Sequence, residues 1–171
     1  TNTATHVQMF EAIAGKVPTF AHLPLISDIE GGKLSKRLGS QSVREVQQEG
    51  LEAMSVVSLL ARLGTSDPIE PFSSIDDLIK TFDFSKFSKG SPKLDPEELA
   101  RLNAKIIHEM PYDDAATRLG QMGVGELDES FWNAVRPNLN KLEDAKEWWD
   151  IANSVVEAEV EDPLSLIHIS E

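Results

Sequence analysis

The stretch that decides the fold is Phe20-Ala21-His22-Leu23-Pro24-Leu25-Ile26, followed after four residues by Gly31-Gly32-Lys33-Leu34-Ser35-Lys36-Arg37. The first segment is short, apolar and interrupted by proline, which is typical of a β-strand that ends at a loop. The second places two lysines, an arginine and a serine directly behind a glycine pair. Cationic and hydroxyl donors in this density can hold a polyphosphate, and glycines allow backbone angles that other residues avoid. We therefore expect a strand over 19–26 that leads into a basic, mobile, phosphate-binding loop.

The lysines of this loop suggest a specific chemistry. An enzyme that forms an adenylate must stabilise the charge that develops on the pyrophosphate leaving group, and lysines on a loop that closes over ATP can supply that stabilisation. The competing phosphate-binding device, a P-loop, needs the spacing G-x-x-x-x-G-K-[ST], which is absent. A solvated basic turn is the plainer alternative, because so short a pattern also arises by chance.

The sequence around the loop predicts a mostly α fold. Residues 3–14 carry Val7, Phe10 and Ile13 at helical spacing, with Gly15 as the stop signal. A helix, a strand and a loop in this order fit the last unit of a Rossmann-like parallel α/β sheet, which binds ligands at the carboxyl ends of its strands. After Gly39 the pattern becomes helical, and we expect helices over 42–50, 51–63, 74–82, 96–110, 111–119, 128–135 and 141–159.

Two of these helices carry strong start signals. Ser42 with Glu45 forms a capping-box pattern, and Asp95-Pro96 supplies an N-cap followed by proline at the first helical position. The helix over 51–63 is apolar on most faces, so we expect it to be buried.

Composition narrows the class of protein. The 171 residues are 40% hydrophobic, which is enough for a core, and contain no cysteine, which excludes disulfides and cysteine-based zinc sites. No apolar run approaches the roughly 20 residues that span a bilayer, and the first residues lack the plan of a signal peptide. We therefore expect a cytoplasmic protein without membrane contact. Because the chain opens on Thr1 in what reads as the middle of an element, we expect a piece of a larger nucleotide-using enzyme.

The charge is unevenly spread. The net charge of −13 argues against a nucleic-acid partner. Residues 126–171, however, hold 12 acidic side chains against three basic ones, whereas residues 33–44 hold four basic side chains and no acidic one. Local patches steer ligands, so the overall sign does not decide the question.

Several motifs in combination resemble a bacterial glutamyl-tRNA synthetase, a class I aminoacyl-tRNA synthetase. Lys33-Leu34-Ser35-Lys36-Arg37 resembles the lysine-x-serine-lysine-arginine signature loop of that family, and residues 22–26 resemble the strand before it. Residues 59–64 are similar to the family helix asparagine-tyrosine-leucine-alanine-x-leucine-glycine, although Ser58-Leu59 replaces asparagine-tyrosine. Asn2-Thr3 with Gln8, Asp83-Phe84 and Leu102-Asn103 also fall at family-like positions. The resemblance covers roughly residues 1–120.

The resemblance implies a reaction and a domain plan. ATP, with magnesium, and glutamate would form glutamyl-adenylate, and the glutamate would pass to the 3′ end of tRNA. Residues 1–39 would end the catalytic domain, 40–100 would form the stem-contact region, and 101–162 would form part of a helical anticodon-binding domain. Residues 163–171 fit poorly and read as a true strand, a truncation or foreign sequence. The family's ATP motif with histidine and its glutamate pocket would precede Thr1, so we expect the chain to be inactive alone and a monomer when full length.

The resemblance also implies roles for individual residues. Lys36 would be the main contact to the ATP phosphates in the transition state, and Lys33 with Ser35 would support the closed form of the loop. Arg37 would add charge or hold the loop. The backbone groups of Leu25 and Ile26 would lie near adenine. His22, beside the loop, is a candidate site residue, with a packed or backbone-bonded role as its alternative.

Other candidates have structural explanations. His6, His108 and His168 are scattered, without a second ligand at i+3 or i+4, so we expect no metal site. Trp132, Trp148 and Trp149 could stack bases, but in a helical pattern we favour core or interface positions.

Three functions remain open. The first is the synthetase fragment. The second is a relative that charges a modified tRNA base and lacks an anticodon domain, and the long helical region argues against it. A glutaminyl enzyme is also disfavoured, because that family continues into β-barrels. The third is a non-catalytic helical module that binds tRNA or protein.

Overall fold

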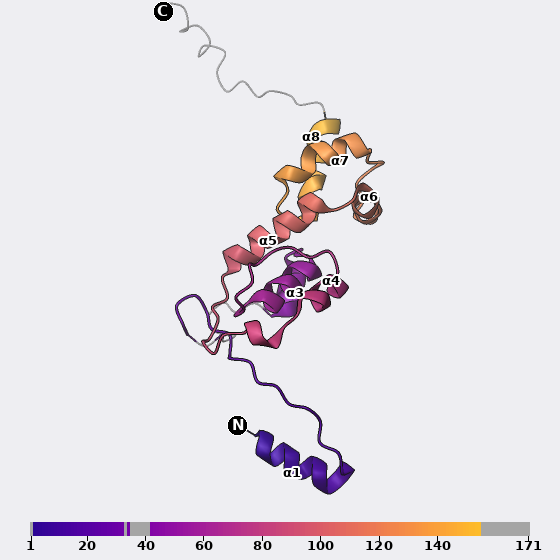
Figure 1. Cartoon of the computed structure of the whole chain (residues 1–171). Helices are drawn as coiled ribbons and strands as arrows, with labels where there is room; N and C mark the ends of the chain where they lie inside the picture. Colours follow the sequence, from indigo (N-terminus) through magenta and orange to yellow (C-terminus); the bar gives the residue numbers. More distant parts are fainter. Residues whose placement is uncertain (1, 33, 35–41, 155–171) are drawn as a thin grey trace, which may run out of the picture.

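The structure, a computed structural model, describes residues 2–32, 34 and 42–154 (Figure 1). Within these residues the chain is mostly helical, as predicted. The α-helices are α1 (Thr3–Ala14), α2 (Val43–Gln48), α3 (Ala53–Arg62), α4 (Ile75–Thr81), α5 (Pro96–Glu109), α6 (Tyr112–Gln121), α7 (Glu129–Val135) and α8 (Ala145–Asn153). Three 3₁₀ turns, η1 (Phe84–Lys86), η2 (Arg136–Asn138) and η3 (Leu142–Asp144), connect them.

The predicted strand over 19–26 is wrong. The segment is extended, but within the described ranges its nearest approach to a ladder is an isolated parallel bridge between Ser27 and Lys93, one residue beyond its end. A strand needs a neighbour to receive its hydrogen bonds, and Figure 1 shows this segment running alone from α1 to the remaining helices. Leu23 and Leu25 are accordingly exposed. The helix before it is confirmed, and Gly15 ends it in the left-handed conformation at φ 65°.

The first helical unit comprises α2, α3, α4 and the amino-terminal half of α5. Its core is a cluster of buried apolar side chains from α2, α3 and α5: Val46, Leu59, Leu99 and Leu102. The predicted capping box of Ser42 and Glu45 is present at the start of α2. Asp95 caps α5 by accepting a hydrogen bond from the backbone of Glu97, with Pro96 in the first turn as expected. Burial on most faces of α3 is wrong in part, because Leu60 is 45% exposed.

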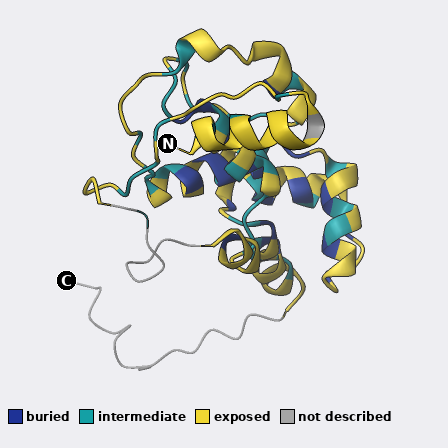
Figure 2. Cartoon of the chain, turned by 90° about the horizontal axis from the view of Figure 1, so that it is seen from below, coloured by how far each residue is buried: buried dark blue, intermediate teal, exposed yellow. Residues whose placement is uncertain are grey.

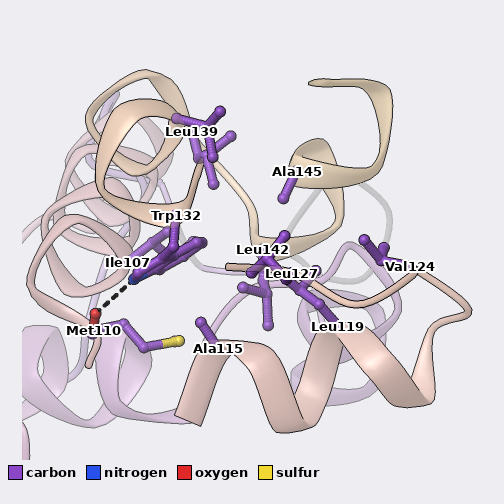
Figure 3. Close-up of a cluster of buried hydrophobic side chains, with 11 residues drawn as sticks. Ile107, Met110, Ala115, Leu119, Val124, Leu127, Trp132, Leu139, Leu142 and Ala145 are labelled. Carbon is purple, nitrogen blue, oxygen red and sulfur yellow. Dashed lines mark hydrogen bonds between the residues drawn. The ribbon is translucent and has the colours of Figure 1, made fainter. Parts of the chain in front are cut away.

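The second helical unit comprises the carboxyl-terminal half of α5 with α6, α7, η2, η3 and α8. Its core is larger (Figure 3) and consists of Ile107, Met110, Ala115, Leu119, Val124, Leu127, Trp132, Val135, Leu139, Leu142 and Ala145. Trp132 is fully buried, and its indole Nε1 donates a hydrogen bond to the Met110 carbonyl at 3.1 Å. The core position expected for this tryptophan is thereby confirmed, whereas Trp148 is 42% exposed.

Helix α5 is shared by both units. Leu99 and Leu102 lie in the first cluster, and Ile107 and Met110 lie in the second. The division expected between residues 100 and 101 therefore falls inside a continuous helix. Figure 2 shows that the buried residues gather along the inner faces of the helices, whereas α1 carries mostly exposed positions.

The last predicted helix is shorter in the structure. A 3₁₀ turn, η3, precedes α8, and α8 ends at Asn153. The remainder of the predicted helix 141–159 beyond residue 154, His168 and the tail 163–171 lie outside the described residues. Of the helices that the structure describes, none has the length and apolar character that a bilayer crossing requires.

Candidate functional site

The segment that leads to the basic loop is anchored at Ser27. Its backbone N–H donates to the Pro92 carbonyl at 2.9 Å, and its carbonyl accepts from the Leu94 N–H at 2.8 Å. The Ser27 hydroxyl also donates to the Pro92 carbonyl at 3.2 Å. Since Leu94 packs against the first core and residue 95 caps α5, the anchor ties the approach of the loop to the first helical unit.

A closed turn follows at once. The Asp28 N–H donates to the Gly32 carbonyl at 3.0 Å, and the Gly31 N–H donates to the Asp28 carbonyl at 3.0 Å. The Asp28 carboxylate accepts from the Gly32 N–H at 2.6 Å. Gly31 has φ 90°, a conformation that favours glycine, and a Cβ on Gly32 would lie 2.6 Å from Asp28 Oδ2, so the Asp28 side chain would have to shift. The glycine pair therefore lies in a hydrogen-bonded turn before Lys33, whereas the sequence analysis used these glycines to explain a mobile loop.

The far side of the basic segment is fixed as well. Residues 33–41 lead to Ser42, which begins α2, and Val46 on that helix lies in the first core. Of the predicted site residues, Lys33, Ser35, Lys36 and Arg37 lie outside the described residues. Leu34, between them, is half-buried.

The structure describes the other three predicted site residues. His22 is exposed, and its ring Nε2 lies 3.0 Å from the Thr3 hydroxyl at the start of α1. Leu25 is 73% exposed, and Ile26 is half-buried. These residues precede the Asp28–Gly32 turn in the extended segment that follows α1. The contact between His22 and Thr3 joins residues 22–26 to Asn2-Thr3, two motifs that the sequence analysis treated as separate resemblances.

Sequence reasoning missed Asp28 and its turn. A signal was present, because aspartate at the first position of a β-turn and glycine at i+3 is a common turn pattern. It also missed the Pro92–Leu94 anchor, for which the sequence holds no signal.

The described structure anchors the chain before residue 33 and again from Ser42 onward, and the sequence places Lys33, Lys36 and Arg37 between these two points. Lysine and arginine side chains in such density commonly bind phosphate groups. Within residues 2–32, 34 and 42–154, no group of three or more histidine, aspartate or glutamate side chains is arranged to hold a metal ion.

Comparison with known proteins identifies similar chains. Residues 1–101 match the sequence model of the family described as tRNA synthetases class I (E and Q), catalytic domain. A glutamate–tRNA ligase of Azospirillum brasilense is 49% identical over 156 residues, which are 91% of this chain and 35% of the relative. A glutamate–tRNA ligase 1 of Maricaulis maris is 44% identical over 164 residues, which are 95% of this chain and 37% of the relative. The chain thus spans about a third of the length of the curated relatives that it matches.

Solved structures share the fold. A glutamate tRNA ligase from Elizabethkingia meningosepticum, crystallised in complex with its amino acid, superposes with a TM-score of 0.69 at 22% identity. The match covers 97% of this chain and 40% of the other. The glutamate–tRNA synthetase of Elizabethkingia anophelis superposes with a TM-score of 0.63 over 85% of this chain. At these identities the likeness concerns the fold alone.

Proposed function

Because this chain belongs to the class I tRNA synthetases for glutamate and glutamine (E and Q), we propose that it forms part of a glutamate–tRNA ligase. In the proposed reaction the glutamate carboxylate attacks the α-phosphate of ATP, and pyrophosphate leaves. The adenylate so formed then yields its glutamyl group to a terminal ribose hydroxyl of tRNA, and AMP is released. The single observation that carries the proposal is the 49% identity, over 91% of the chain, to a glutamate–tRNA ligase.

The basic segment has a defined part in this proposal. Lys36 stabilises the charge that develops on the departing pyrophosphate, Lys33 and Ser35 support the closed form of the loop, and Arg37 adds charge or holds it. The Ser27 anchor and the Asp28–Gly32 turn support this assignment, because they fix the chain on the amino-terminal side of Lys33. A fixed starting point limits the positions that the cations can reach, and preorganised charge is what favours a transition state over the substrate.

The residues before the turn would border the nucleotide. Backbone groups of Leu25 and Ile26 would lie near adenine, and His22 would border the same space. The exposure of Leu25 supports its assignment, because its surface is available to a ligand or to another part of the protein. Magnesium would accompany ATP as part of the substrate complex.

The domain plan follows the same proposal. Residues 1–39 belong to the end of the catalytic domain, 40–100 contact the tRNA stem, and 101–162 begin the anticodon-binding domain. The two hydrophobic clusters support two units that divide within α5, although the change from one cluster to the other falls between Leu102 and Ile107. We also propose a cytoplasmic enzyme that acts as a monomer, with tRNA and glutamate as its other substrates.

A chimaera tests the function. The chain replaces the matching segment of the Azospirillum brasilense relative, and single-turnover formation of glutamyl-tRNA is measured together with tRNA affinity. We expect activity in the chimaera, and a loss of about 100-fold to 1,000-fold in Lys36→Ala with little change in tRNA affinity. Lys146→Ala, an exposed lysine on α8, is the control and should keep the parent rate.

Two outcomes would count against the proposal. A folded chimaera that makes no glutamyl-tRNA would contradict the ligase function and favour the non-catalytic module. A Lys36→Ala rate equal to that of the parent would contradict the role of Lys36 alone.

A further inference from the structure

The two helical units share one helix, α5. Helix α5 runs through both cores, and beside it a groove of about 190 Å³ lies between the units. The groove is lined by side chains of both units, among them Met54, Phe72, Ile106, Met110 and Asp114. Units joined in this way are expected to move relative to each other unless another contact fixes them.

A charged pair crosses this junction. Arg118 of α6 donates from Nη2 to Glu52 Oε1 at 2.7 Å and from Nη1 to Glu52 Oε2 at 2.9 Å. The two side chains are 39% and 14% exposed. The hydrogen bonds that Arg118 donates to the Glu52 carboxylate raise the pKa of Arg118 above its ordinary value, although burial acts in the opposite direction. The guanidinium therefore stays charged at every pH at which the protein would be studied.

Glu52 lies at the start of α3, yet its side chain bonds to the other helical unit. Glu52 occupies the N-cap position of α3, where the helix dipole favours a negative charge and shorter side chains such as aspartate bond to the first backbone N–H groups. No such side-chain bond forms at this cap. Both carboxylate oxygens are instead directed to an arginine 66 residues away in the other unit.

A second polar link lies beside the first. The Asn103 side chain, which is fully buried on α5, accepts a hydrogen bond from the Glu52 N–H at 2.7 Å. Its amide group donates to the Asn140 carbonyl, also at 2.7 Å. One side chain thus joins the start of α3 to the segment before η3. At Gly50, a Cβ would lie 3.2 Å from Glu143 Oε1, so the Glu143 side chain of the second unit approaches the first unit closely at this point.

The physics of burial points to orientation as the role of these links. Arg118 stays partly in water, so solvent screens its attraction to Glu52, and such a partly exposed pair adds only modestly to stability. It does impose a geometry, since a two-pronged pair tolerates few relative positions of its partners. We propose that Glu52, Arg118 and Asn103 form a clamp that fixes the angle between the two helical units about α5.

The clamp acquires a role in catalysis only if the proposed ligase function holds. The first unit would then contact the tRNA stem and the second would begin the anticodon-binding domain, so the angle between them would decide whether one tRNA can reach both. In that case the clamp residues position tRNA and touch neither ATP nor glutamate.

The angle itself is measurable in this chain. Because the protein has no cysteine, Asp76→Cys on α4 and Asn133→Cys on α7 provide the sole attachment points for spin labels, both at exposed positions. Electron–electron double resonance then gives the distribution of distances between the units. We expect one narrow peak in the parent, and a peak about twofold wider in both Glu52→Gln and Arg118→Met. The double variant should match the single ones, because all three remove the same contact.

Controls separate the clamp from a general loss of structure. Glu97→Gln removes an exposed ion pair with Arg101 on the same α5, and its distribution should equal that of the parent. Arg118→Lys keeps the charge but loses the two-pronged geometry, and it should widen the peak even if the harsher variants fail to fold. Asn103→Leu removes the second link and should also widen the peak. Parent-like distributions in folded Glu52→Gln, Arg118→Lys and Asn103→Leu would overturn the clamp.

The same variants in the chimaera test the catalytic consequence. We expect KM for tRNA to rise roughly 10-fold in Glu52→Gln while kcat and KM for ATP stay at parent values. An unchanged KM for tRNA alongside a widened peak would overturn the positioning role and leave the clamp standing. An inactive parent chimaera with a narrow peak would refute the ligase function alone.

Discussion

Replacing Trp132 by phenylalanine should destabilise the second helical unit by an amount that the structure sets. The indole is fully buried, and its Nε1 donates to the Met110 carbonyl at 3.1 Å. That carbonyl keeps one long hydrogen bond, from Arg136 Nη1 at 3.5 Å, so losing the indole N–H should cost about 1 kcal/mol. The smaller ring leaves a cavity in a packed core, worth about 1–3 kcal/mol more. We therefore expect a loss of about 2–4 kcal/mol in the free energy of unfolding.

Tryptophan fluorescence in urea measures this loss directly. The three tryptophans all lie in the second unit, so Trp148 and Trp149 still report its unfolding in the variant. At an unchanged m-value the midpoint should fall by about 1–2 M. Trp148→Phe is the matched control, because this side chain is 42% exposed and its loss should change the free energy by less than about 0.5 kcal/mol. Equal midpoints for the two variants would refute the reasoning from burial.

Two further predictions concern local geometry. Gly64 has φ 83°, and its Cβ would lie 3.2 Å from the Pro92 side chain, so Gly64→Ala should lower the free energy of unfolding by about 1–2 kcal/mol in thermal or urea unfolding. Gly120→Ala, a helical position with open space around it, should leave that free energy unchanged or raise it, and the reverse order would contradict the strain. Hydrogen bonds from Lys80 and Ser74 lower the pKa of the exposed Asp77, so its contribution to stability is present above the pKa of the unfolded chain and lost as the pH falls through the folded value. An NMR titration should show this pKa rise towards its ordinary value in Lys80→Met, and an unchanged titration would contradict the assignment.

Local signals in the sequence predicted most of the helices. Ser42 with Glu45 and Asp95 with Pro96 carry their own capping partners within three residues, so the start of each helix can be read without knowledge of the fold. The same holds for the end of α1 at Gly15, where a left-handed residue is needed. Trp132 follows the apolar spacing of α7, which is why its core position was also predictable.

The strand failed for the opposite reason. Its apolar pattern over 19–26 is a property of the segment, whereas a ladder is a property of two segments. The partner that the structure provides, at Lys93, lies 66 residues from Ser27 in the sequence and touches the chain at a single bridge. Of the candidate site, the sequence predicted the basic residues from composition and resemblance. It could not predict the Pro92–Leu94 anchor, because backbone hydrogen bonds leave no signature in residue identity.

The clamp shows why polar contacts between units are the hardest feature to read. A glutamate before a helix already has a sufficient local explanation in the helix dipole, and an arginine in the last turn of α6 has the same one. Each residue type fits its own helix, so neither position signals a distant partner. Only the three-dimensional arrangement shows Glu52 turned away from α3 and joined to Arg118 at 2.7 Å. A charged residue that already fits its own helix therefore gives no sign of a long-range contact in the sequence. The variant Glu52→Gln distinguishes a role in the dipole of α3 from a role in the clamp. A dipole role predicts a small change confined to α3, whereas the clamp predicts a wider distribution of distances across the molecule.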